Sequence, residues 1–179
     1  MANMVGTWRL DYRFVAAMIA GSIIVIWLVR LCLALGVHQT ILADYFKSGS
    51  EMKVILNEPA LAKNEIRSIK TSTLPSNDPR PRFDISIVEI GGYAWHNHRG
   101  VLYLRFFNNR LSSVVFYPDD FNHFLSEMAR PLGLTGMGKK SNSPDMKIFV
   151  GSDTEGRSFI TWQDIGLFSE EVHWLRRYS

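Results

Sequence analysis

Residues 83–117 read FDISIVEIGGYAWHNHRGVLYLRFFNNRLSSVVFY, and this stretch decides the fold. Apolar and polar side chains alternate from Phe83 to Ile87, which is the period of a half-buried strand. Residues 101–107 and 111–117 are two further apolar runs, separated by a short polar link rich in asparagine. Asparagine tolerates the positive φ of a tight turn. The stretch therefore predicts a three-stranded antiparallel meander.

The flanking segments predict helices and one more hairpin. Helices are expected where apolar residues recur at three- and four-residue spacing: residues 38–47, 50–57, 59–70, 118–128 and 168–178. A loop is expected at residues 71–82, which contain three prolines. Residues 146–150 and 158–162 predict a hairpin. The expected fold class is α+β, a small domain whose antiparallel sheet, the meander plus the hairpin, is packed by helices.

A second stretch, residues 14–37, reads FVAAMIAGSIIVIWLVRLCLALGV and carries one charge. As a helix it would extend roughly 36 Å, enough to cross a bilayer. The sequence therefore predicts a tail at 1–13, a single transmembrane helix at 14–37 and an extramembrane domain at 38–179. A cleaved secretory signal and a buried core helix are the alternatives. The arginines of the tail favour a cytoplasmic N-terminus and a periplasmic domain, as in a bacterial inner-membrane protein.

Three residues of this stretch are candidates for packing against other membrane helices. Ala17 and Gly21 have the spacing that lets two helix backbones approach closely. Arg30 either extends its side chain to the headgroups or pairs with a carboxylate or carbonyl of a neighbouring subunit. The expected partners are therefore other integral membrane protein subunits and the lipid bilayer.

Composition excludes some classes of function. The chain has 20 Lys and Arg, 17 Asp and Glu and a formal net charge of +3, without the clustered basic residues of a nucleic-acid-binding surface. Nucleic acid is therefore not an expected partner. The single cysteine, Cys32, lies in the apolar stretch, so the domain that follows has neither a disulfide nor a cysteine-based metal site.

The motifs that carry chemistry are few. His96 and His98 would project from one face of a strand and could share a metal, but no second ligand motif accompanies them and a polar turn is favoured. Residues 133–140, GLTGMGKK, resemble a phosphate loop except that Lys140 replaces the hydroxyl residue. Asp119-Asp120 suits a helix N-terminus better than acid–base chemistry. We therefore expect no catalytic residue, no metal site, no cofactor and no enzymatic activity.

Aromatic residues suggest a contact surface instead. Tyr, Trp and Arg are favoured at protein interfaces. The polar link between the first two predicted strands and the residues just before it form a possible partner-contact edge: Tyr93, Trp95, His96 and His98.

Two local runs resemble a known family. Residues 48–59 (SGSEMKVILNEP) and 102–117 (LYLRFFNNRLSSVVFY) are similar to parts of BamE-like small outer-membrane assembly lipoproteins. The resemblance covers Ser48–Pro118, with Asn57 in place of the family's turn glycine and without its lipid-bearing cysteine. It implies a helix pair on an antiparallel sheet and a role in holding a membrane-protein complex together.

These expectations converge on an accessory subunit. The leading hypothesis is a non-enzymatic, single-pass membrane protein that binds and stabilises a larger membrane protein complex. The alternative is a membrane-tethered module that binds a small ligand or lipid in an apolar pocket between sheet and helices. A metal protein or enzyme built on His96 and His98 is the third hypothesis.

Overall fold

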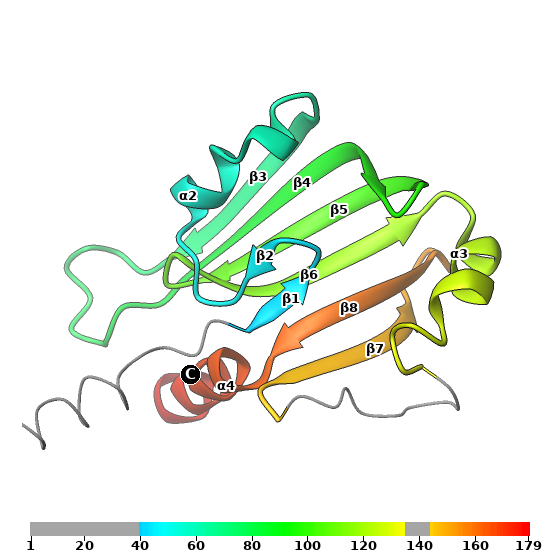
Figure 1. Cartoon of the computed structure of the whole chain (residues 1–179). Helices are drawn as coiled ribbons and strands as arrows, with labels where there is room; N and C mark the ends of the chain where they lie inside the picture. The colour runs from blue at the N-terminus through cyan, green and yellow to red at the C-terminus, as the bar shows by residue number, and fades with distance from the viewer. Residues whose placement is uncertain (1–39, 135–143) are drawn as a thin grey trace, which may run out of the picture. The chain divides into compact units, whose positions relative to one another are not determined.

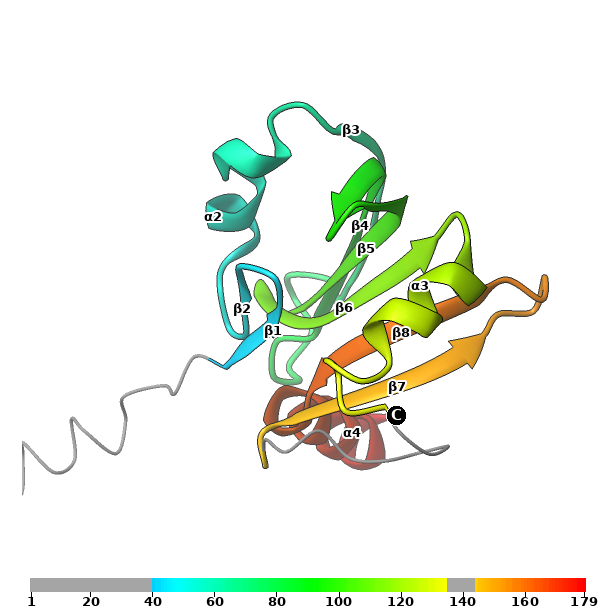
Figure 2. The ribbon, with the colours of Figure 1, turned by 45° about the vertical axis from the view of Figure 1, so that its right-hand side comes forward.

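The computed structural model describes residues 40–134 and 144–179 (Figures 1 and 2). Contacts along the chain separate residues 1–38 from residues 39–179, and every described element belongs to the second unit. The features of that unit are given below.

Most of the described chain forms one six-stranded sheet in which every neighbouring pair is antiparallel. In spatial order its strands are β3 (Glu65–Thr73), β4 (Asp84–Trp95), β5 (His98–Phe107), β6 (Arg110–Pro118), β8 (Ser158–Asp164) and β7 (Met146–Ser152). A small hairpin precedes it, made of β1 (Ile41–Ala43) and β2 (Phe46–Lys47). The helical segments are α2 (Met52–Leu56), a 3₁₀ turn (Pro59–Leu61), α3 (Phe121–Met128) and α4 (Ile165–Tyr178).

The tight turns of the meander follow from its asparagines. Asn97, Asn108 and Asn109 have φ values of 70°, 49° and 65°, the left-handed region that asparagine tolerates better than most residues. The register of β4 against β5 shifts between Ile90 and Tyr93, so the two glycines between them form the expected bulge. Strands β4, β5 and β6 therefore occupy the segments where the sequence predicted a meander.

The hydrophobic core lies on one side of this sheet, which we call the first face. Its side chains are at most 1% exposed: Val88, Ile90, Leu104, Val114, Phe116 and Ile160. Several elements cover them with buried side chains: Leu42 and Phe46 of the hairpin, Ile55 of α2 and Phe124 of α3. Figure 1 shows the hairpin in front of the sheet, where β1 contacts β6 and β8.

Two predicted helices are wrong. Residues 38–47 form the β1–β2 hairpin from Ile41 onward, turning at Asp44 with a φ of 51°. Residues 59–70 form the 3₁₀ turn and then strand β3, which continues into the predicted loop as far as Thr73. Both segments have backbone partners far along the chain, and pairing of β3 with β4 outweighs the helical spacing of its apolar residues.

The predicted fold class is therefore wrong in its helical part. The domain is sheet-rich, and the helix pair expected before the meander consists of one short helix, a 3₁₀ turn and an edge strand. The part of the chain that the structure describes contains no helix long and apolar enough to span a membrane. Its longest helix, α4, has 14 residues, or roughly 21 Å, and carries charged side chains.

The predictions of a transmembrane helix, a single-pass topology and a periplasmic domain are corrected accordingly. Their physical basis was the segment 14–37, which lies outside the described residues, as do Ala17, Gly21 and Arg30. No described element takes over the role of that segment.

Candidate functional site

The second face of the sheet, opposite the core, carries a row of side chains that the pairing register places side by side. Tyr103 is paired with Glu89 on one flank and with Val115 on the other, and Thr161 lies between Val115 and Phe149. Thr161 is buried, whereas the large side chains of the row are only half-buried. The row is therefore partly open to solvent.

Aromatic rings extend this row towards the ends of β6 and β8. Tyr117 stacks near Tyr103 and Phe159, with ring centroids 5.5 and 5.2 Å away. The guanidinium of Arg157 lies 5.1 Å from the Tyr117 ring, at the distance of a cation–π contact. The Tyr103 hydroxyl donates to Glu89 at 2.9 Å, and burial followed by this bond raises the pKa of Tyr103. The open part of the second face is thus aromatic with a few paired charges.

Helix α4 covers the other end of the second face. Arg105 of β5 donates two hydrogen bonds to Glu171, at 2.5 and 2.6 Å, in a bidentate ion pair. The Glu171 side chain is only 8% exposed. Next to it, Glu170 pairs with Arg110 at 2.5 Å at the surface. Neither acid was singled out from the sequence except as a first-turn residue of the last predicted helix.

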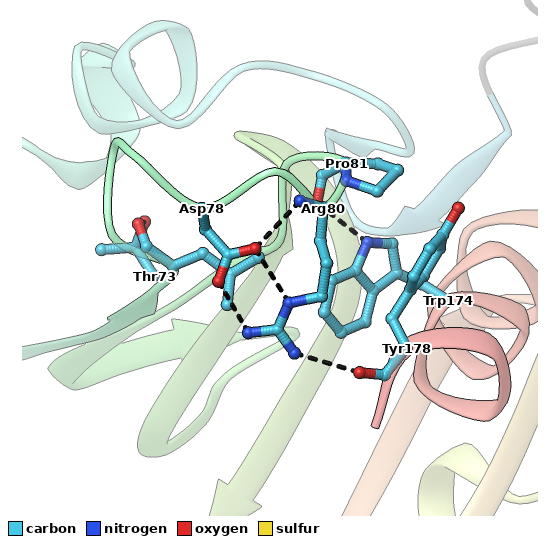
Figure 3. A network of polar contacts seen from close by, with 7 residues as sticks. Thr73, Asp78, Arg80, Pro81, Trp174 and Tyr178 are labelled. Carbon is cyan, nitrogen blue, oxygen red and sulfur yellow. Dashed lines mark hydrogen bonds and ion pairs between the residues drawn. The ribbon is translucent and has the colours of Figure 1, made fainter.

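The loop before β4 holds the C-terminal part of α4, as Figure 3 shows. The indole nitrogen of Trp174 donates to the carbonyl of Pro81 at 3.0 Å, and Arg80 donates to the carbonyl of Tyr178 at 3.0 Å. Arg80 also binds Asp78, and these hydrogen bonds lower the pKa of Asp78 to about 2. These contacts fix α4 at one end of the sheet and leave the aromatic row at the other.

Three side chains that could ligate a metal converge at the opposite end of the molecule, between β5 and α3. The Nε2 atom of His98 lies 3.0 Å from one carboxylate oxygen of Glu127, and Nε2 of His123 lies 3.5 Å from the other. His98 is buried, whereas His123 and Glu127 are exposed. Of the two histidines considered from the sequence, His98 belongs to this group and His96 does not.

The residues of the predicted contact edge have different surroundings. Tyr93, Trp95 and His98 are 5%, 7% and 8% exposed and belong to or border the core, whereas His96 is exposed in the β4–β5 turn. The contact role proposed for the three buried side chains would require the domain to open. The alternation within β4 had pointed to this outcome, because every second residue from Ser86 to Ile90 is buried.

The other motifs are absorbed by the fold or lie outside its description. Asp120 accepts a hydrogen bond from the backbone nitrogen of His123 at 2.9 Å, which is the expected helix cap. Of the loop at residues 133–140, the structure describes only Gly133 and Leu134.

Comparison with known proteins gives this chain no relative. No family model, no curated protein and no solved structure matches it. The resemblance of residues 48–118 to BamE-like lipoproteins therefore stays a prediction.

Proposed function

We propose that this chain is a non-enzymatic accessory protein that binds and stabilises a larger protein complex. The observation that carries the proposal is the half-buried aromatic row on the second face of the sheet, which includes Tyr103, Val115 and Tyr117. Large apolar side chains at this density lose solvent-exposed area when a partner covers them. The neutral, aromatic character of the row suits a protein surface rather than nucleic acid.

The alternative of a ligand pocket between sheet and helices has weaker support. Aromatic rings occupy that space: Trp95 packs edge-on against Trp162 with centroids 4.9 Å apart, and Phe124 lies 5.6 Å from Trp95 and 5.7 Å from Phe116. A ligand entering there would have to displace well-packed rings, which costs several kcal/mol. A partner bound on the second face requires no such rearrangement.

The test is native purification of the full chain from its source, followed by size determination and identification of co-eluting proteins. Val115→Arg places a charge in the middle of the aromatic row. Val54→Arg makes the same change on α2, where the side chain is 56% exposed and away from the second face. Near-UV circular dichroism of both variants checks that they are folded.

We expect the wild-type chain and Val54→Arg to elute with a partner and Val115→Arg to elute without it. A wild-type chain that runs as a lone monomer contradicts the proposed function. If both variants retain the partner, the function stands and the second face is not the docking surface.

A further inference from the structure

Three side chains from separate parts of the sequence meet where β5 begins. His98 is the first residue of β5, directly after the β4–β5 turn, and its ring packs edge-on against Phe124 with centroids 5.2 Å apart. His123 and Glu127 are four residues apart on α3 and so lie on one face of that helix. Their potential ligand atoms lie within 4.8 Å of one another.

The separations suit a small cation. Zinc–nitrogen and zinc–oxygen bonds are about 2.0–2.2 Å long, so two neighbouring donors of a tetrahedral site lie about 3.4 Å apart. The Glu127 oxygens lie 3.0 and 3.5 Å from the two imidazole nitrogens. Only His98 is held in place by burial, because the side chains of His123 and Glu127 are 59% and 55% exposed. Small rotations of these two exposed side chains would bring all three donors into bonding distance.

We propose that His98, His123 and Glu127 bind a divalent transition-metal ion, with zinc the best match. Two imidazoles and one carboxylate form a donor set that zinc accepts in proteins, and water completes the coordination on the exposed side. The ion joins α3 to the first residue of β5. Because the ligands are positioned in the folded domain and not in the unfolded chain, ion binding stabilises the fold. This inference does not depend on the partner proposed above.

The same three residues have a purely structural explanation, which the test must separate from metal binding. Without an ion, Glu127 accepts a hydrogen bond from His98 and forms an ion pair with His123 when that ring is protonated. Such a bridge would hold α3 to the sheet regardless of the metal content of the solution. A metal site instead makes stability depend on the concentration of the ion.

The experiment titrates Zn²⁺ into metal-free full-length protein by calorimetry and records the melting temperature with and without the ion. Co²⁺ provides a second readout, since its visible absorption reports coordination by nitrogen and oxygen ligands. His123→Gln and Glu127→Gln remove ligands whose side chains are exposed, so the domain should keep its fold. The matched control is His173→Gln, which removes an exposed histidine of α4.

We expect one zinc ion per chain and a melting temperature that rises by about 5 °C at a hundredfold excess over Kd. His123→Gln and Glu127→Gln should each weaken binding at least tenfold, and His173→Gln should leave it unchanged. The proposal is overturned if the wild-type chain binds no zinc. It is equally overturned if zinc binds with the same affinity to the His123 and Glu127 variants, because the ion would then be held elsewhere.

Discussion

Glu171 is the charged residue whose side chain is most deeply enclosed by its contacts in α4. It accepts both hydrogen bonds of the Arg105 guanidinium, whose own side chain is 27% exposed. Removing one member of a buried pair leaves the other charge without compensation, which costs about 3–5 kcal/mol in full burial and less where water reaches the arginine. Its neighbour Glu170 forms a comparable pair at the surface, with its side chain 54% exposed.

We therefore predict that Glu171→Gln lowers the free energy of unfolding by about 2 kcal/mol, because Arg105 keeps its charge and loses its bidentate partner. Glu170→Gln, the same change one residue away, should cost at most about 1 kcal/mol. Urea denaturation monitored by tryptophan fluorescence measures both. Equal effects of the two substitutions would show that burial does not distinguish these ion pairs.

Tyr93 makes the stability of the domain sensitive to high pH. Burial, together with the hydrogen bond that its hydroxyl donates to Asp44 at 2.9 Å, raises the pKa of Tyr93 well above its ordinary value of 10.0. The folded protein therefore keeps the phenolic proton at pH values where the unfolded chain loses it. This contribution to stability is complete below pH 10 and is lost as the pH rises above it.

We expect the free energy of unfolding to fall above pH 10, by at most about 1.4 kcal/mol per pH unit for this one group. Tyr93→Phe should reduce that slope without abolishing it, since burial also raises the pKa of Tyr45. At pH 7 the substitution should cost about 1 kcal/mol for the lost hydrogen bond. Denaturation curves between pH 7 and 11 provide the measurement, and an unchanged slope in the variant would contradict the assignment.

At the scale of elements, the approach of β5 to β6 depends on Gly100. A Cβ atom at this position would collide with the backbone carbonyl oxygen of Tyr117 and would lie 2.8 Å from the Cα of Pro118. Backbone atoms of a paired strand cannot rotate away as a flexible side chain can. Gly92, in the bulge of β4, has no heavy atom within 4 Å of the corresponding position but a φ of 64°.

Gly100→Ala should therefore destabilise the domain by about 3 kcal/mol or more, since the strands must separate to admit the methyl group. Gly92→Ala should cost only about 1–2 kcal/mol, the strain of a left-handed backbone. Thermal unfolding of the two variants tests this order. A smaller loss for Gly100→Ala than for Gly92→Ala would mean that β5 and β6 pair less closely than described.

At the scale of the whole molecule, the described hydrophobic core lies between Leu42 and Trp174. The sheet, its two covering layers and the contacts of α4 all belong to the unit that begins at residue 39. Strands from distant parts of the sequence alternate in this sheet, because β6 pairs with β8 across the segment that contains α3 and β7. Such interleaving favours cooperative unfolding of the unit.

We predict that residues 39–179 expressed alone fold and unfold in one transition. The near-UV circular dichroism of the buried tryptophans and the far-UV signal of the backbone should change together on heating. Two separate transitions would show that α4 or the β1–β2 hairpin is an independent unit. A fragment without near-UV signal would show that the first 38 residues are needed for folding.

The sequence predicted the elements whose signals are local. The meander turns contain asparagines that tolerate positive φ, the β7–β8 hairpin was expected around its polar turn, and α3 begins with the aspartate that caps it. Local signals failed for β1, β2 and β3. The apolar residues of β3 also fit a helical period, so only a pairing partner in β4 could decide between helix and strand.

The candidate sites were less predictable than the elements. His98 was visible as one of two nearby histidines, but its actual neighbours are His123 and Glu127 on a helix 25 residues further on. The aromatic row on the second face joins residues of β5, β6, β7 and β8. No spacing within one segment encodes such a row, because it arises from the register between strands.

The sequence by itself determined where three central strands, two turns and two capped helices lie, because hydrophobic period, turn chemistry and capping act within a few residues. Only the tertiary structure decided that residues 65–73 form an edge strand, that Tyr93, Trp95 and His98 are buried, and that α4 covers one end of the second face. These features depend on contacts between residues far apart in the chain. Their energies come from strand pairing, burial and one enclosed ion pair, which exist only once the sheet has formed.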